Sequence, residues 1–127
     1  MVDTEQMMAT VEAYISSYNR ADLDGICAIF AEDAIVEDPV GSPPRIGQAA
    51  LREFFAVGIA ARARLTLDGP VRCTADHAAF PFHVHLNWDG RARSIDVIDV
   101  FQFDANAKVK KLQAFFGENN TVPLAED

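Results

Sequence analysis

The chain has 127 residues, of which 50% are hydrophobic and 24% are charged. This length suffices to bury one hydrophobic core and is short for two, so the sequence predicts a single domain over residues 1–127. The 11 basic and 19 acidic side chains leave a formal charge of -8, which argues against nucleic acid or an anionic membrane surface as a partner. No apolar run approaches the roughly 18 residues that span a bilayer, and the start of the chain does not resemble a signal peptide, so we expect a cytoplasmic protein.

The first half of the chain carries apolar residues at helical spacing. Asp3 and Gln6 resemble a capping pair, and they precede a stripe that predicts a first helix: Met7, Met8, Val11, Tyr14, Ile15 and Tyr18. Asp22 is placed to cap a second, shorter helix with the inner face Leu23, Ile26, Cys27 and Phe30. After a loop over residues 39–47, a third helix is predicted with the stripe Leu51, Phe54, Phe55, Gly58 and Ile59.

From about Leu65 onward the hydrophobic period changes to two, which indicates strands. The clearest strand alternates from Phe80 to Trp88, and the Asp89-Gly90 pair that follows is a strong signal for a tight hairpin. Helices first and an antiparallel meander afterwards predict an α+β fold. In this fold three helices pack on one face of a curved, mostly antiparallel sheet and enclose a cone-shaped apolar cavity.

Asp38 is the first candidate for chemistry. In the short strand predicted around residues 34–38, Asp38 shares one side with Ala34 and Val36, and Pro39 fixes the backbone just after it. This placement points a carboxylate into the cavity from the end of a strand. A solvated aspartate in the following turn fits the spacing equally well.

Asp99 interrupts an otherwise apolar row on the return strand, where Ile95, Val97, Phe101 and Phe103 share its face. Burial there favours the neutral acid, which is able to donate a hydrogen bond. A buried aspartate paired with an arginine is the structural alternative, and Arg91 and Arg93 lie farther along the same face.

Tyr14 lies on the apolar stripe of the first helix, so its hydroxyl needs a partner once it is buried. Alone it would be read as a core tyrosine. Together, an inward carboxylate, an inward carboxylic acid and an inward phenol supply one proton acceptor and two hydrogen-bond donors, a set that suits enolisation beside a carbonyl group.

At these residues the sequence resembles the bacterial ketosteroid isomerases (steroid Δ5-isomerases) of the NTF2-like, SnoaL-like superfamily. The likeness runs over nearly the whole chain, and its most specific stretches are residues 21–26 (ADLDGI), 36–42 (VEDPVGS), 51–55 (LREFF), 98–103 (IDVFQF) and 115–118 (FFGE) with Asn120. The resemblance implies that Asp38 is the general base and that Tyr14 and Asp99 form the oxyanion hole.

The resemblance also implies a reaction, a set of substrate contacts and a partner. Asp38 would move a proton from C4 to C6 of a 3-oxo-Δ5-steroid through a dienolate, without a metal, nucleotide or flavin cofactor. The apolar substrate would contact residues on inward files: Phe55, Phe82, Val84, Leu86, Trp88, Leu112 and Phe116. The family further implies a homodimer formed through the outer face of the sheet.

Departures from the family and competing functions remain open at this point. Phe55 and Phe30 stand where members of the family carry tyrosines, and Tyr18 is either a substitute for those hydroxyls or a core or interface tyrosine. A polyketide cyclase or hydrolase on the same fold would need further polar residues deep in the cavity, and a non-catalytic binding module would need none of the three chemical residues. His83 and His85 alternate away from the cavity, so no metal site is expected.

Overall fold

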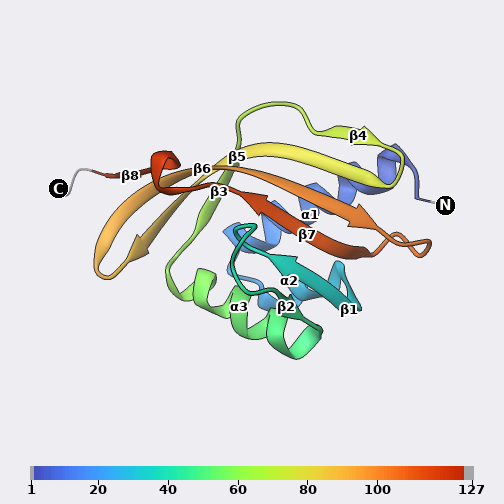
Figure 1. The fold of residues 1–127 in the computed structure, drawn as a ribbon, viewed down its shortest axis with the longest axis horizontal. Helices are drawn as coiled ribbons and strands as arrows, with labels where there is room; N and C mark the ends of the chain where they lie inside the picture. Colours follow the sequence, from blue (N-terminus) through green and yellow to red (C-terminus); the bar gives the residue numbers. More distant parts are fainter. Residues whose placement is uncertain (1, 125–127) are drawn as a thin grey trace.

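The computed structural model describes residues 2–124. Its helices are α1 Thr4–Asn19, α2 Leu23–Ala28, α3 Gln48–Ala60 and the 3₁₀ turn η1 Glu118–Asn120. Its strands are β1 Phe30–Glu37, β2 Arg45–Ile46, β3 Arg64–Leu67, β4 Arg72–Thr74, β5 His77–Trp88, β6 Arg91–Phe103, β7 Val109–Phe115 and β8 Thr121–Pro123. The helices lie against one side of a long curved sheet, which is the predicted α+β arrangement (Figure 1).

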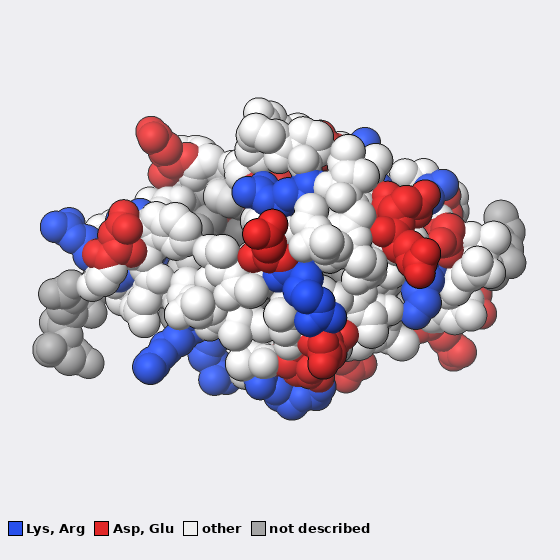
Figure 2. All heavy atoms as spheres, turned by 90° about the horizontal axis from the view of Figure 1, so that it is seen from below, with Lys and Arg blue, Asp and Glu red and all other residues white. Residues whose placement is uncertain are grey.

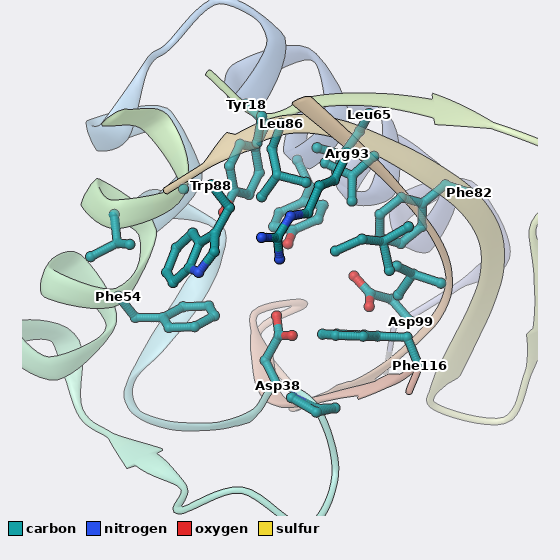
Figure 3. A pocket seen from close by; sticks show the side chains of 18 of the residues that line it. Tyr18, Asp38, Phe54, Leu65, Phe82, Leu86, Trp88, Arg93, Asp99 and Phe116 are labelled. Carbon is teal, nitrogen blue, oxygen red and sulfur yellow. The ribbon is translucent and has the colours of Figure 1, made fainter. Parts of the chain in front are cut away.

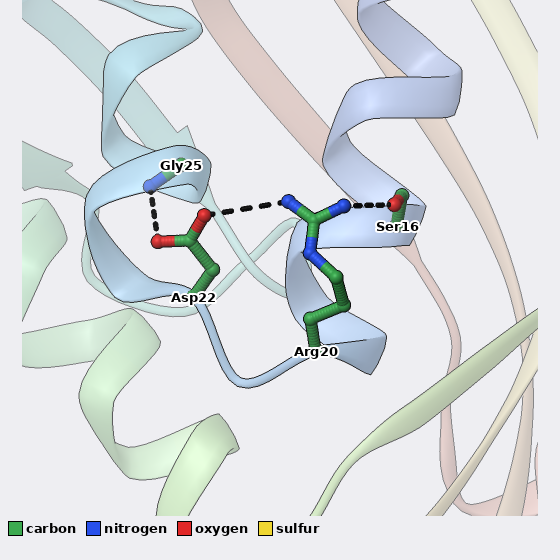
Figure 4. A network of polar contacts seen from close by, with 4 residues as sticks. All are labelled: Ser16, Arg20, Asp22 and Gly25. Carbon is green, nitrogen blue, oxygen red and sulfur yellow. Dashed lines mark hydrogen bonds and ion pairs between the residues drawn. The ribbon is translucent and has the colours of Figure 1, made fainter.

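Both predicted aspartate caps are present at the starts of helices. At α1, the Gln6 backbone N–H donates to the Asp3 carboxylate at 2.8 Å, and the Gln6 side chain accepts from the Asp3 backbone N–H at 2.9 Å. At α2, Asp22 accepts from the Gly25 backbone N–H at 3.0 Å and pairs with Arg20, which in turn donates to Ser16 (Figure 4). These contacts satisfy N–H groups that the first turn of a helix leaves without partners. The second helix ends earlier than predicted, because Phe30 already begins β1.

The sheet has eight strands, and its main path runs β2-β1-β7-β6-β5-β3. Along the β5–β6 hairpin, Trp88 pairs with Arg91 and Phe80 pairs with Asp99. Asp89 and Gly90 both have positive φ, at 51° and 75°, as the predicted tight turn requires. The pairing of β1 with β7 is parallel, so a strand from the first half of the chain joins the later meander and makes the sheet mixed.

The hydrophobic core lies between the helices and the concave face of the sheet. Its fully buried side chains include Met7 and Val11 from α1, Ile26 from α2, and Phe101 and Phe103 from β6. Asn19 fastens the end of α1 to β3, because its side chain donates to the Leu65 carbonyl at 2.9 Å and accepts from the Leu65 N–H at 2.8 Å.

The surface carries both signs of charge. On the face shown in Figure 2, acidic and basic side chains are interspersed among uncharged ones. Within residues 2–124, no helix is long and apolar enough to cross a membrane.

Candidate active site

A cavity of about 700 Å³ opens between α1, α3 and the concave face of the sheet. Its wall combines apolar side chains from the β5–β6 hairpin with polar groups from α1, β2, α3, β6 and β8 and from the loop after β1 (Figure 3). Tyr14, Asp38 and Asp99 all line this one cavity. The three residues that sequence reasoning singled out for chemistry are therefore brought together in space, although they lie far apart along the chain.

Asp38 reaches the cavity from the end of β1. Val36 on the same file is fully buried, and the Asp38 carboxylate continues that file into the cavity, where it is partly buried. The loop after it is held in place because the Val40 N–H donates to the Ala114 carbonyl at 2.9 Å, and the Ser42 hydroxyl donates to the Pro39 carbonyl at 2.6 Å. Burial raises the pKa of Asp38 to about 6, against an opposing effect of the Arg45 guanidinium.

Asp99 lies on the cavity-facing file of β6 with only 1% of its surface exposed. Its strand neighbours, Phe80 on β5 and Ala114 on β7, are apolar. Within the described residues, its Oδ1 atom is buried and has no hydrogen-bond partner. Burial raises the pKa of Asp99 well above its ordinary value of 3.8, and the nearby Asp38 charge raises it further.

Tyr14 projects from α1 into a cage of aromatic rings. Phe101 and Tyr18 lie edge-on to its ring at centroid distances of 5.2 and 5.5 Å, and Phe55 and Phe30 lie at 6.1 and 6.4 Å. Burial, the charge of Asp99 and smaller effects of Tyr18 and Asp38 raise the pKa of Tyr14 well above 10. The phenol therefore holds its proton at neutral pH and remains a hydrogen-bond donor.

Two of the expected substrate contacts are not at the cavity wall. Phe55 and Leu112 are fully buried and do not line the cavity. On α3 the cavity contact is made one residue earlier than expected. The Phe55 ring packs against the Phe30 ring, with the two centroids 5.3 Å apart, and its neighbour Phe54 lines the cavity. Leu112 lies on the correct side of β7 but too deep, where it pairs with Phe101. The remaining expected contacts do line the wall: Phe82, Val84, Leu86, Trp88 and Phe116.

The cavity is more polar than sequence reasoning suggested. Besides the three chemical residues, it is lined by Tyr18, Arg45, Glu53, Arg93 and Thr121. The position of Arg93 on the cavity side could be predicted from the sequence, because Arg93 shares the parity of Asp99 along β6. The position of Arg45 could not, because it depends on the short β1–β2 pairing of Val36 with Arg45. Tyr18 lines the cavity as well as packing in the core, where only 9% of it is exposed.

The histidines lie outside the cavity wall. His83 pairs with Asp68 at 2.7 Å between its Nδ1 atom and the carboxylate, and His77 pairs with Asp76 at the same distance. In the part of the chain that the structure describes, no three His, Cys, Asp or Glu side chains are grouped to hold a metal ion.

These features define a class of protein: an α+β cone with a largely apolar cavity, in which Asp38, Asp99 and Tyr14 line one wall. The model of the SnoaL-like domain family matches residues 11–112, and the chain belongs to this NTF2-like family. It is 35% identical over 120 residues to a steroid Δ-isomerase from Nocardioides simplex, an alignment that covers 91% of this chain and 97% of that protein. The structure also matches an epoxide hydrolase/cyclase-like enzyme, SalBIII, that acts in pyran ring formation in the polyether salinomycin. For this pair the TM-score is 0.90 and the identity is 26%, and the match covers 98% of this chain and all of that one.

Proposed function

We propose that the protein is a steroid Δ-isomerase, which moves the double bond of a 3-oxo-Δ5-steroid into conjugation at Δ4. The observation that carries this proposal is the pair of carboxyl groups in one cavity. Asp99 is buried, and its Oδ1 atom has no hydrogen-bond partner among residues 2–124, while Asp38 lies at the wall with a pKa of about 6. The likeness to the steroid Δ-isomerase of Nocardioides simplex supports the same reaction.

The electrostatics give the two carboxyl groups different roles. At neutral pH, Asp38 is mainly ionised and accepts a proton, because its pKa is about 6. Asp99 is more completely desolvated and also feels the negative charge of Asp38, so it keeps its proton and donates a hydrogen bond. Two carboxyl groups in one cavity thereby act as a base and as an acid.

The proposed reaction needs only these groups and a dry cavity. Asp38 takes the C4 proton of the substrate, and the electron pair moves toward the 3-oxo oxygen to form a dienolate. Tyr14 and Asp99 donate hydrogen bonds to that oxygen and stabilise its negative charge. The protonated Asp38 then returns the proton to C6, which restores the carbonyl group and leaves the conjugated enone. Apolar side chains exclude water that would compete for the proton.

A second candidate is ring closure or opening of an epoxide by the same acid and base, and the match to the epoxide hydrolase/cyclase-like enzyme SalBIII favours it. In that reaction Asp99 would protonate the epoxide oxygen while Asp38 takes a proton from the attacking hydroxyl group. The additional polar residues of the wall, including Glu53 and Arg93, are compatible with such a substrate. Conversion of an epoxy alcohol with no isomerisation of a steroid enone would favour this candidate.

We also propose a homodimer that forms through the outer face of the sheet. Ile98 and Phe115 are paired neighbours on β6 and β7, and they face away from the cavity with 49% and 45% of their surfaces exposed. Burial of these side chains against a second copy removes apolar surface from water.

The decisive experiment measures conversion of 5-androstene-3,17-dione to its conjugated 4-ene isomer by ultraviolet absorbance. We expect activity in the wild type and a loss of roughly 100-fold or more in Asp38→Asn, because the variant has no general base. Asp33→Asn is the matched control, since Asp33 is an exposed acid on the same strand and should leave the rate unchanged. Equal rates for wild type and Asp38→Asn would contradict the assignment of the base.

A further inference from the structure

Arg93 lies on the cavity wall at the end remote from Asp99. The cavity-facing file of β6 is Arg93, Ile95, Val97 and Asp99, all of which line the cavity. Six residues at roughly 3.3 Å each put at most about 20 Å of strand between the first and the last of them. The two polar ends of this file are therefore separated by an apolar stretch that suits a rigid ring skeleton.

Arg93 has no acidic partner within salt-bridge distance among residues 2–124. Its strand neighbours are Leu86 on β5 and Pro123 on β8, neither of which has a side-chain acceptor. Among residues 2–124 it forms no ion pair and no side-chain hydrogen bond, although it is partly buried. Figure 3 shows its guanidinium group pointing into the open cavity.

The other arginine of the wall differs in this respect. The Arg45 guanidinium lies 4.5 Å from the centre of the Phe54 ring, and it lowers the pKa of Asp38. Arg45 thus has partners within the protein. Arg93 has none among the described residues, and a neutral hydrocarbon skeleton placed against it would desolvate the cation without compensation.

We propose that Arg93 binds a carboxylate on the end of the substrate remote from the enone, so that the substrate class is a 3-oxo steroid acid. This inference rests on the proposed isomerase function. The planar guanidinium group matches a carboxylate with two parallel hydrogen bonds, and partial burial strengthens such a pair. Because the protein as a whole carries a charge of -8, an anionic substrate needs a local cation in the cavity.

The test compares a ligand acid with its uncharged isostere. The probes are 3-oxo-4-androstene-17β-carboxylate and the corresponding carboxamide, which are Δ4 compounds and do not turn over. Binding is followed by the fluorescence of Trp88, because this residue is the one tryptophan of the chain and lines the cavity. We expect the carboxylate to bind about tenfold more tightly than the amide to the wild type.

Variants of two arginines separate the proposed contact from a general effect of charge. In Arg93→Met the ratio of the affinities for acid and amide should fall to about one. In Arg93→Lys the ratio should be intermediate, because lysine keeps the charge but lacks the planar guanidinium group. Arg64→Met is the control, since Arg64 is exposed on β3 and does not line the cavity. It should keep the full preference.

Two results would overturn the proposal. One is equal affinity of the wild type for acid and amide, which would mean that Arg93 stays solvated at the cavity mouth and only covers apolar wall. The other is an unchanged preference in Arg93→Met. Neither result bears on the isomerase reaction, because the dione assay above uses an uncharged substrate. Absence of dione isomerisation together with a strong preference for the acid would contradict the proposed function and leave the carboxylate contact in place.

Discussion

Asp38 and Asp99 are the same residue type in the same cavity, and their different surroundings separate their chemistry. Asp38 comes from the end of a strand, is partly exposed and has Arg45 nearby, whereas Asp99 is enclosed in the middle of β6. Strand parity predicted that Asp99 faces inward, whereas for Asp38 the spacing fitted a solvated turn equally well. Their proton affinities were not predictable, because these depend on depth of burial and on Arg45, which arrives through a two-residue strand with little sequence signal.

The rate of the proposed reaction should therefore depend on pH through Asp38. With its pKa at about 6, the protein should lose kcat/KM for the uncharged dione about tenfold per pH unit well below pH 6, and reach a plateau above about pH 7. Arg45→Met should move the midpoint upward, because the cation that favours the ionised form is removed. Arg52→Met is the control and should not move the midpoint, because Arg52 forms an exposed ion pair with Asp24. A rate that stays constant down to pH 5 would contradict this role.

Asp99 should leave a signature in stability rather than in rate alone. Its pKa is raised on folding, so the folded state binds the proton more tightly, and the stability that this supplies is complete below the unfolded pKa and lost as the pH rises. Relative to wild type, Asp99→Asn should become more stable as the pH rises above about 4, by up to about 1.4 kcal/mol per pH unit.

Urea unfolding of both proteins between pH 4 and 8 measures this difference. Asp96→Asn is the matched control, because Asp96 is an exposed acid on the opposite face of the same strand. A difference in the free energy of unfolding that does not change with pH would show that Asp99 is ionised in the folded protein.

At the scale of elements, Gly58 on α3 lies directly against Tyr18 on α1. A Cβ atom at Gly58 would collide with the Tyr18 hydroxyl and lie only 3.0 Å from Cε1 of its ring. The missing Cβ atom at Gly58 thus leaves the space that the Tyr18 hydroxyl occupies. The sequence could not reveal this contact, because a glycine in a helical stripe gives no information about its neighbour.

Gly58→Ala should lower the free energy of unfolding by about 1–3 kcal/mol, even though alanine favours helix by about 1 kcal/mol over glycine. Thermal or urea unfolding measures the change. In the Tyr18→Phe background the same substitution should cost less, because the closest atom of the contact is gone. A stabilising effect of Gly58→Ala in the wild-type background would show that the Tyr18 side chain moves aside without loss of folding free energy.

The hydrophobic patterns of strands predicted which side of the sheet a residue faces, but not how deeply it is buried. The alternation over residues 80–88 placed Phe82, Val84, Leu86 and Trp88 on the cavity side, as the structure has them. Leu112 has the correct parity but is fully buried beyond the cavity wall. Parity predicts the side of a strand on which a residue lies, not how deep in the fold it is. In α3, adjacent Phe54 and Phe55 both belong to the predicted stripe, and the angle at which the helix packs decides which of them faces the cavity.

At the scale of the whole molecule, the outer sheet face should determine oligomeric state. Ile98→Asp places a charge in the centre of the proposed interface, and we expect it to convert a dimer to a monomer in sedimentation-equilibrium measurements. Met8→Asp is the control, because Met8 is similarly exposed at 48% but lies on helix α1. A wild-type protein that stays monomeric at every concentration, or an Ile98→Asp dimer, would contradict the proposed interface.

The layer order of the molecule was predictable because helical and strand periods occupy separate halves of the chain. The parallel pairing of β1 with β7 was not, since a short strand between two helices gives no information about its distant partner. That pairing fixes Asp38 relative to Asp99, and so the relation between the two carboxyl groups comes from tertiary structure.

The β1–β7 pairing also has a consequence for synthesis of the protein. Val36 pairs with Leu112 and Glu37 with Gln113, so the segment that precedes Asp38 is held by one made about 75 residues later. Closing so long a loop comes late in folding. A nascent chain that has not yet reached β7 holds Tyr14 and Asp38 without the strand that positions β1, so we expect the proposed activity to appear only after β7 is made and pairs with β1.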